Sequence, residues 1–174
     1  SKIAAGGWHS LAVRRNGTVV AWGYNGDQQT NVPGGLNDVI AAAGGLRHSV
    51  LLKAYGRVRA WGYEGAAQPT AAASLENVAA IAAGSLHNLA LRSDGTIVAW
   101  GDNALGQRNV PAGLTNVVAI AAGAGHSLVL KSDGTIAGWG TNGFGQLTIP
   151  EEATNIVAIA AGAMGCTQNP SYTW

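Results

Sequence analysis

Short apolar segments of four to seven residues alternate with turn residues along the chain. Val, Ile, Leu and Thr are frequent in these segments, and Gly, Asn or Pro bounds them, which is typical of β-strands. Asp94-Gly95 lies between two such segments and favours a two-residue hairpin turn, because both turn positions favour positive φ. No segment keeps a 3.6-residue period, so the pattern predicts antiparallel strands rather than helices. The clearest example has segments at residues 77–84, 87–91, 96–101 and 107–111.

This arrangement of segments and turns returns every 39 residues. A fixed period of this length is typical of a repeat architecture, in which one unit of secondary structure is stacked several times. Four short antiparallel strands per unit, arrayed radially, describe the blade of a β-propeller. The sequence therefore predicts an all-β propeller with four 39-residue blades. The residues that keep the register are Trp22, Trp61, Trp100 and Trp139; His9, His48, His87 and His126; Gly17, Gly56, Gly95 and Gly134; and Gln29, Gln68, Gln107 and Gln146.

The repeat predicts one propeller domain over residues 1–164 and a non-repeat tail over residues 165–174. The tail begins where Gly165 stands at the position of the repeated His. An arc of four blades leaves two unpaired sheet faces, which favours association. We therefore expect a fragment of a longer protein or an oligomer that completes the ring, rather than a closed four-bladed monomer. The predicted units span about residues 1–38, 39–77, 78–116 and 117–155, with a partial fifth unit at 156–164.

The second copy of the repeat is the most divergent. Tyr55 precedes the turn Gly56, where the other copies have Asp or Asn, and Glu64 stands in place of Asn. Ala71-Ala72 replaces the Val-Pro of other copies. Because Pro lacks an N–H, we expect the Val-Pro segments at an edge strand or in a connection.

The periodic tryptophans and histidines are assigned structural roles. An indole ring at one place in every blade fills the gap between neighbouring sheets, with its N–H bonded locally. The four histidines are expected to bond backbone groups near the strand turns. They cannot share one zinc ion, because facing sheets pack about 10 Å apart whereas zinc needs its ligands at roughly 2.0–2.1 Å. We therefore predict no metal site.

The sequence carries no recognisable catalytic arrangement. Ser10, Ser49 and Ser127 follow a histidine directly, but adjacent residues on a strand point to opposite faces. No nucleophile elbow, phosphate loop or dinucleotide fingerprint occurs. Cys166, the only cysteine, can form no internal disulfide and has no designated base. We predict no catalytic residue, no cofactor and no enzyme activity.

Charge is unevenly distributed along the chain. The composition is 47% apolar and 11% charged, as expected for a globular chain with a large core. Residues 1–59 sum to +5 and the remainder sums to −4. Two interpretations stay open: solvated faces of different blades, or a basic patch that contacts an acidic partner or nucleic acid.

Location is not determined by the sequence. No apolar run approaches the roughly 20 residues of a membrane helix, so no membrane association is expected. No charged-then-apolar leader is visible before the repeat. A secreted bacterial location and a cytoplasmic location are both compatible with the chain.

Residues 123–146 carry a specific motif: Gly-x-x-His-Ser-Leu-x-Leu-Lys-Ser-Asp-Gly-Thr-Ile-x-x-Trp-Gly-x-Asn-x-x-Gly-Gln. It resembles the repeat of the regulator of chromosome condensation family. The Val-Pro after Gln is most similar to bacterial members, among them the propeller-type β-lactamase inhibitory protein. The resemblance covers about residues 1–164 and implies a ring of about seven blades. It does not imply one function, since the family includes exchange factors, photoreceptors, inhibitors and scaffolds.

Two loops vary most between the copies while their flanks stay constant. One precedes the repeated His and the other follows Trp-Gly, and loops on the rim of a rigid scaffold often carry function. Trp, Tyr and Arg dominate interface energetics, so Trp8, Tyr24, Arg47 and Tyr63 are the predicted anchors. The other predicted partner-binding residues are Leu86, Leu105 and Phe144.

The leading functional hypothesis is a non-catalytic scaffold that binds a protein partner through these loops. The resemblance offers two alternatives: an inhibitor of a β-lactamase-type enzyme, or a guanine-nucleotide exchange or chromatin-docking module. Only Trp8 is aromatic at the position before His, which weakens the inhibitor hypothesis. Self-association to close the ring is a further expectation, and nucleic acid is not expected as a partner.

Overall fold

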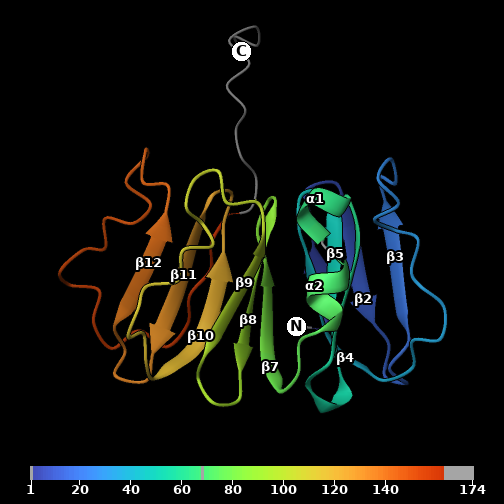
Figure 1. Cartoon of the computed structure of the whole chain (residues 1–174), viewed down its shortest axis with the longest axis horizontal. Coiled ribbons are helices and arrows are strands. Elements are labelled where there is room, and N and C mark those ends of the chain that lie inside the picture. The colour runs from blue at the N-terminus through green and yellow to red at the C-terminus, as the bar shows by residue number, and fades with distance from the viewer. Residues whose placement is uncertain (1, 68, 163–174) are drawn as a thin grey trace, which may run out of the picture.

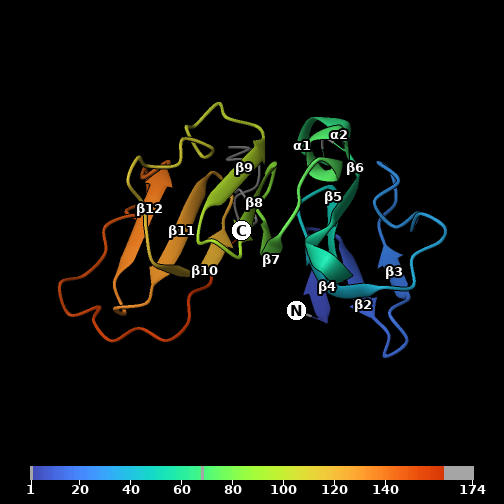
Figure 2. The same ribbon diagram turned by 60° about the horizontal axis from the view of Figure 1, so that its bottom comes forward.

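The computed structural model describes residues 2–67 and 69–162 and folds them into four three-stranded antiparallel sheets (Figure 1). In every sheet the strands follow chain order. The sheets stand side by side as the blades of an open arc, as a second view shows (Figure 2). The strands are β1 (Ile3–Ala5), β2 (His9–Val13) and β3 (Val19–Gly23); β4 (Val39–Gly44), β5 (His48–Lys53) and β6 (Val58–Gly62); β7 (Val78–Ala83), β8 (His87–Arg92) and β9 (Ile97–Gly101); and β10 (Val117–Ala122), β11 (His126–Lys131) and β12 (Ile136–Gly140).

The prediction of four strands per blade is wrong by one strand. Residues 107–111, expected as the fourth strand, form a loop. Their N–H groups serve local turns instead of a ladder: Asn109 N donates to Gly106 O at 3.0 Å, and Val110 N donates to Arg108 O at 2.8 Å. Pro111 has no N–H to donate. The Val-Pro segments are therefore connections, which was the other expected place for them.

The predicted hairpin turns join the second and third strands. Asp94 Oδ1 accepts hydrogen bonds from Thr96 N at 2.9 Å and from Thr96 Oγ1 at 2.6 Å, and Asp133 holds Thr135 in the same way. In the second blade this turn is a short 3-10 segment, η1 (Ala54–Gly56), with Tyr55 at φ 62°. The turns lie at one end of every blade, opposite the predicted binding loops.

The second blade departs from the strands-only prediction. Its loop after β6 contains two short helices, α1 (Glu64–Ala67) and α2 (Pro69–Ala73). Alanine has a high helix propensity, and this copy lacks the Val-Pro that shapes the other loops. Ala72 and the following Leu75 are buried against the second and third sheets. Gln68, one of the four periodic glutamines, lies outside the described residues.

The hydrophobic core is divided among the interfaces between neighbouring sheets. Leu11 and Trp61 pack between the first and second sheets, and Leu89 and Trp139 pack between the third and fourth. Trp61, Trp100 and Trp139 are 8%, 3% and 7% exposed, as expected for rings between sheets. Trp22 is 53% exposed, because no described residues cover the first sheet on that side. The indole of Trp139 donates to Gln107 O on the preceding blade at 2.8 Å, so its bond is not local to its own blade.

The histidines join neighbouring blades through side chains and not, as expected, through backbone groups. His9 Nε2 contacts Ser49 Oγ at 2.9 Å, and His87 Nε2 contacts Ser127 Oγ at 2.9 Å. Both serines donate to a glutamine carbonyl on the preceding blade at 2.8 Å, so the histidine must donate to the serine. His48 Nε2 donates to the side-chain oxygen of Asn88, Oδ1, at 2.7 Å, because an amide oxygen can only accept. The sequence separation is 40 residues each time, one repeat plus one.

The predicted fifth unit is only partly described. Residues 155–162 continue the repeat sequence but form no strand with described residues. Residues 163–174 lie outside the described part, together with the predicted tail and Cys166. The boundaries predicted for the domain and its units stay predictions.

Candidate protein-binding rim

The two variable loops of each blade are joined by a backbone hydrogen bond at one end of the sheet. Tyr24 N donates to Trp8 O at 2.8 Å, and Tyr63 N donates to Arg47 O at 2.9 Å. The later blades repeat this bond from Asp102 N to Leu86 O at 2.8 Å and from Thr141 N to Gly125 O at 2.9 Å. The residue before His and the residue after Trp-Gly therefore always lie side by side. The loops predicted from sequence variation form one rim.

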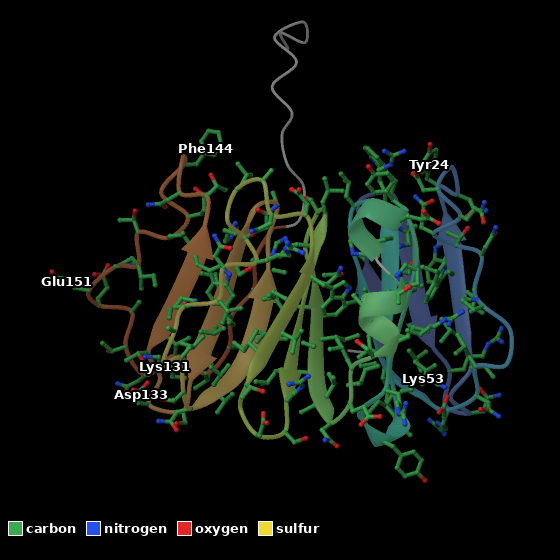
Figure 3. All side chains as sticks on the ribbon, viewed as in Figure 1. Tyr24, Lys53, Lys131, Asp133, Phe144 and Glu151 are labelled. Carbon is green, nitrogen blue, oxygen red and sulfur yellow. The ribbon has the colours of Figure 1, made fainter. Side chains whose placement is uncertain are left out.

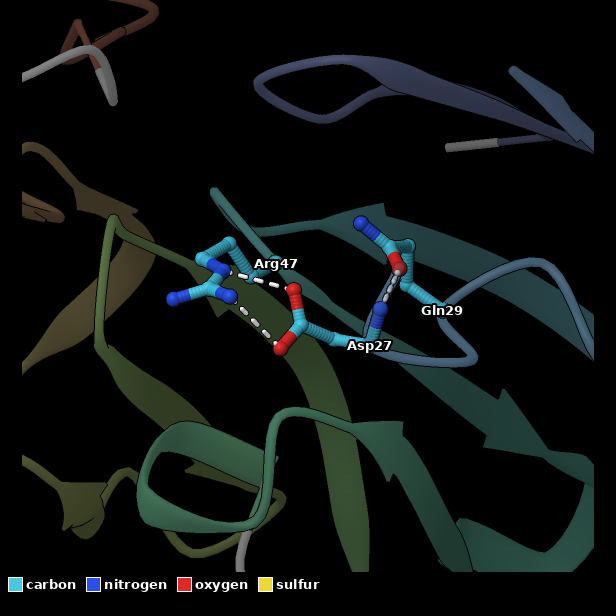
Figure 4. Close-up of polar contacts among 3 residues, drawn as sticks. All are labelled: Asp27, Gln29 and Arg47. Carbon is cyan, nitrogen blue, oxygen red and sulfur yellow. Dashed lines mark hydrogen bonds and ion pairs between the residues drawn. The ribbon is translucent and has the colours of Figure 1, made fainter. Parts of the chain in front are cut away.

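Aromatic and charged side chains of blades one and two lie on this rim in two groups. The rings of Trp8 and Tyr24 form an edge-to-face pair with centroids 6.0 Å apart. The Arg47 guanidinium lies over the Tyr63 ring, 5.1 Å from its centroid. Arg47 also makes a bidentate ion pair with Asp27, with distances of 2.6 and 2.8 Å (Figure 4). We call Trp8, Tyr24, Asp27, Arg47 and Tyr63 the rim cluster.

A buried glutamine fixes the shape of the rim loops. Gln29 is fully buried, and its side-chain Oε1 accepts the N–H of Asp27 at 2.9 Å (Figure 4). Gln107 and Gln146 accept the N–H of Leu105 and of Phe144 in the same way, both at 2.8 Å. The repeated Gln thus holds the loop, while the residue two positions before it is free to vary. Asp27 was not among the predicted binding residues. Asp27 stands two repeats before Leu105 and three repeats before Phe144, and this equivalence is the signal that identifies it.

The remaining predicted binding residues lie on the same rim but outside the rim cluster. Phe144 is 85% exposed and lies at the same end of the molecule as Tyr24, on the outermost blade (Figure 3). Leu105 is exposed, and its side chain lies so close to Gly125 that no larger residue would fit there without a shift of Leu105. Leu86 is half-buried on the third blade. The structure therefore brings together the four predicted anchors and leaves Leu86, Leu105 and Phe144 as separate positions along the arc.

A cleft adjoins the rim cluster between the first two blades. Its volume is about 580 Å³, and Tyr63, Asp27 and Trp61 are among its lining residues. Glu64 and Pro69, from the divergent loop of the second blade, complete one wall. A partner side chain could enter this cleft beside the exposed aromatic rings.

Ion pairs neutralise part of the positive charge of the first two blades. Arg47 pairs with Asp27, Lys53 with Asp38 at 3.4 Å and Arg57 with Glu76 at 3.2 Å. Lys2, Arg14 and Arg15 are exposed and line another cleft on the first blade. The rim cluster itself therefore presents aromatic surface and an internally balanced ion pair rather than a basic patch.

The buried His–Ser pairs have no access to a substrate. Ser49 and Ser127 are fully buried, and each hydroxyl proton is committed to a glutamine carbonyl. Burial lowers the pKa of His48 and of His87 to about 4, so both rings are neutral at physiological pH. Burial also lowers the pKa of His9 and of His126. His9, His48 and His87 act as interblade links.

The described residues, 2–67 and 69–162, contain no group of three or more His, Cys, Asp or Glu side chains placed to hold a metal ion. Neither of the helices in that part of the chain has the length and apolar content needed to cross a membrane.

Comparison with solved structures shows the same fold. Prp20p from Saccharomyces cerevisiae is 28% identical, with a TM-score of 0.69 over 86% of this chain and 45% of that chain. Its crystal structure was reported with its binding to Gsp1p and histones, and a second structure holds the same yeast protein bound to Kap60. The ectodomain of the Physcomitrella patens receptor kinase CR4 is 24% identical, with a TM-score of 0.72 over 98% of this chain and 48% of that chain. Human WBSCR16 is 20% identical, with a TM-score of 0.71 over 90% of this chain and 52% of that chain.

The chain thus spans about half the length of these proteins, which agrees with an incomplete propeller ring. Comparison with curated protein sequences found no match. The expected similarity to bacterial members and to the β-lactamase inhibitory protein stays a prediction. The model of the regulator of chromosome condensation (RCC1) repeat matches residues 1–29, 78–107 and 117–146, about half of the chain. The chain therefore belongs to the family of RCC1-repeat proteins.

Proposed function

We propose that this chain is a non-catalytic scaffold that binds a protein partner through the rim cluster. The observation that carries the proposal is the exposed Trp8–Tyr24 pair beside Arg47 stacked on Tyr63. Trp8 and Tyr24 are 58% and 50% exposed, although their rings would be stabilised by burial. Exposed aromatic and Arg side chains that lie together are typical of interface hot spots.

The rim cluster is ordered before a partner arrives. The Trp8–Tyr24 backbone bond, the buried Gln29 and the Arg47–Asp27 pair each restrict the side chains and the loops that carry them. Binding to such a surface loses less conformational entropy than binding to mobile loops. The neighbouring cleft of about 580 Å³ offers a place for one anchoring side chain of the partner.

Quantitative affinity capture from the native host, followed by direct binding measurements, tests this proposal. Trp8→Ala is expected to weaken a captured partner by roughly 30-fold, the equivalent of about 2 kcal/mol for a hot-spot residue. The melting temperature is expected to stay unchanged, because Trp8 contributes to none of the buried clusters between sheets.

Tyr55→Asn is the matched control for this experiment. Tyr55 is also an exposed aromatic residue, 94% exposed, but it lies in a hairpin turn at the other end of the blade. Asn tolerates the positive φ of this position. Loss of binding with both variants, or with neither, would contradict a partner site at the rim cluster.

A guanine-nucleotide exchange or docking module is the second candidate. It is favoured by the 28% identity to Prp20p, a protein reported to bind Gsp1p and histones. Direct titration of this chain with Gsp1p, with histones and with Kap60 tests the candidate. Binding that depends on Trp8 and Arg47 would support it, and no binding at tens of micromolar would reject it.

The β-lactamase inhibitor alternative remains a prediction from the resemblance. Of the residues before the repeated His, only Trp8 is aromatic. Unaffected hydrolysis by a β-lactamase in the presence of excess chain would reject this alternative.

A further inference from the structure

The hairpin turns at the end of the molecule opposite the rim cluster differ in charge between the blades. Residues 92–95 and 131–134 each contain a basic residue followed by Ser-Asp-Gly, so one cation and one carboxylate make these turns neutral. The same repeat positions of the first blade, residues 14–17, are Arg-Arg-Asn-Gly and carry a charge of +2. Lys53 begins the corresponding turn of the second blade and lies at the same end of the molecule as Lys131 (Figure 3). The first blade therefore has a positively charged turn where the later blades have a neutral one.

The turn of the first blade forms without the charge of its second arginine. Asn16 Oδ1 accepts hydrogen bonds from Thr18 N at 3.2 Å and from Thr18 Oγ1 at 2.8 Å. Asp94 and Asp133 make the same two bonds in the later turns. Serine stands at the position of Arg15 in both of those blades. The hairpin thus has no need of an arginine at position 15.

The two arginines of this turn border a cleft between the first and second blades. Its volume is about 410 Å³, and Arg14 and Arg15 are among its lining residues. Val13, Val39 and Ile40 supply apolar lining. Ile40 is 50% exposed, so a part of its side chain is open to an apolar partner group. The cleft combines apolar surface with two guanidinium groups, and both of its blades belong to the described part of the chain.

The positive charge of this cleft is not balanced by the acids around it. Within residues 2–67 and 69–162, neither Arg14 nor Arg15 forms an ion pair. Lys2 adds a further cation to the lining. Asp38 also lines the cleft, but its carboxylate pairs with Lys53 at 3.4 Å. An anionic group that enters the cleft therefore meets guanidinium groups that no described carboxylate neutralises.

A second cleft adjoins the first through the ion pair of Asp38 and Lys53. Asp38 lines the first cleft, whereas Lys53 lines the second, whose volume is about 500 Å³. Arg57 and Arg59 line this second cleft together with residues 33–36. Arg59 forms no ion pair with the part of the chain that the structure describes. Positively charged side chains thus continue from one cleft to the other.

We propose that these two adjoining clefts, which we call the basic clefts, bind an acidic segment of a partner protein. One apolar side chain of the segment packs beside Ile40, and its carboxylates lie beside Arg14 and Arg15. Guanidinium groups bind carboxylates through paired, charge-assisted hydrogen bonds. Burial of an aliphatic group against Ile40 adds an apolar contribution. The basic clefts lie at the other end of the blades from the rim cluster, so this binding is independent of the function proposed above.

Two acidic residues among these cations favour a peptide over a strand of nucleic acid. Asp38 and Glu76 pair with Lys53 and Arg57 at 3.4 and 3.2 Å. A strand of nucleic acid carries one negative charge about every 3.4 Å, so some of its phosphates would lie beside these carboxylates. A peptide has carboxylates only where its sequence places them, and it also supplies an aliphatic side chain for Ile40. The charge pattern and the apolar lining are therefore both met by an acidic peptide.

Fluorescence anisotropy with a labelled peptide tests the proposal on the full-length chain. The probe is the peptide Glu-Glu-Asp-Leu-Glu-Glu-Asp with fluorescein at its N-terminus. We expect saturable binding at low ionic strength that weakens as salt is added, because exposed charges are screened. A peptide with Gln and Asn in place of the acids, and one with Gly in place of Leu, should each bind more weakly. Absence of saturable binding by the acidic probe at low ionic strength would overturn the proposal.

Two substitutions test the charged and the apolar part of the site with residues that the repeat already uses. Arg15→Ser introduces the residue of the third and fourth blades, and Ile40→Ala introduces the residue of the second blade, so both variants should fold. Each is expected to weaken peptide binding about fivefold, the effect of roughly 1 kcal/mol from one charge pair or one partly buried aliphatic group. Unchanged binding in both variants would overturn the proposal.

Arg92→Ser is the matched control for the loss of charge. It removes one positive charge from the equivalent turn of the third blade, where Val118 is 53% exposed at the position of Ile40. We expect binding of the probe within about twofold of the original chain, because the charge lies outside the basic clefts. A loss as large as that of Arg15→Ser would mean that net charge alone attracts the peptide, and would overturn the site.

Two further measurements separate the basic clefts from the alternatives. A labelled thymidine oligonucleotide with the same number of negative charges should bind more weakly than the peptide and should be insensitive to Ile40→Ala. Binding as tight as that of the peptide would overturn the assignment to an acidic protein segment. The Trp8→Ala variant should bind the peptide as well as the original chain does. Loss of peptide binding in that variant would place the peptide on the rim cluster and would overturn the proposal.

Discussion

The third interface lies between the third and fourth blades. The face of the first blade that no described blade covers, which we call the open face, uses the same repeat positions in opposite surroundings: Ile3, Ser10, Ala12, Val20 and Trp22. At the third interface Trp139 is buried and bonded to Gln107, and Ser127 links His87 to the Gln107 carbonyl. At the open face Trp22 is half exposed. The same residue type therefore contributes differently to stability in different blades. Its contribution depends on whether a preceding blade buries it and supplies a hydrogen-bond partner.

The largest expected difference between the two regions concerns the tryptophans. Trp139→Ala removes a buried ring and a hydrogen bond, so the free energy of unfolding should fall by about 3–5 kcal/mol. Trp22→Ala in dilute protein should cost less than about 1 kcal/mol, because the ring is already half exposed. Urea unfolding of both variants at low concentration measures the difference. Equal losses would mean that the first face is covered in solution even when the protein is dilute.

The second-largest expected effect is a loss of stability in acid at the interfaces that His48 and His87 join. The folded-state pKa of His48 and of His87 is about 4, below the ordinary value of 6.5. The unfolded chain therefore binds protons first as the pH falls, and stability is lost between about pH 6.5 and pH 4. The loss approaches about 3 kcal/mol for each histidine. Stability curves from pH 7.5 to 4 check this, with His48→Gln as a variant whose curve should be flatter.

The smallest expected difference in stability between the two regions is that between Ser127→Ala and Ser10→Ala. Ser127→Ala leaves the buried His87 N–H without its partner and removes one of the two hydrogen bonds that the Gln107 carbonyl accepts, which should cost about 1–3 kcal/mol. Ser10→Ala removes a hydroxyl from the open face and should stay within about 0.5 kcal/mol in dilute protein. Thermal melts of the two variants side by side make the comparison. A cost for Ser10→Ala as large as that for Ser127→Ala would contradict it.

The sequence was sufficient to predict the blades and the rim, but not the links between blades. The 39-residue period and the Asp-Gly turns predicted four sheets and the loops at one end, as the structure shows. A period identifies equivalent positions but does not say which neighbour each side chain faces. The separation of 40 residues between His9 and Ser49 is visible in the sequence, yet only the packed sheets show that it joins two blades.

The rim was predicted from variation between copies, and its chemistry was only partly foreseen. Trp8, Tyr24, Arg47 and Tyr63 were predicted as separate anchors, and the structure brings them together in adjoining pairs. Asp27 was missed because its pairing with Arg47 spans two blades. The helices of the second blade were missed as well, since they depend on a local loss of Val-Pro in a segment expected to follow the other copies.

Oxidative footprinting of the tryptophans tests the central claim most directly, because it follows Trp22 within the same sample as the buried rings of Trp61, Trp100 and Trp139. In dilute protein we expect Trp22 to be oxidised nearly as fast as the exposed Trp8 and far faster than those three. If Trp22 is instead protected as well as the three buried rings, the open face is covered and the account of the first blade is wrong.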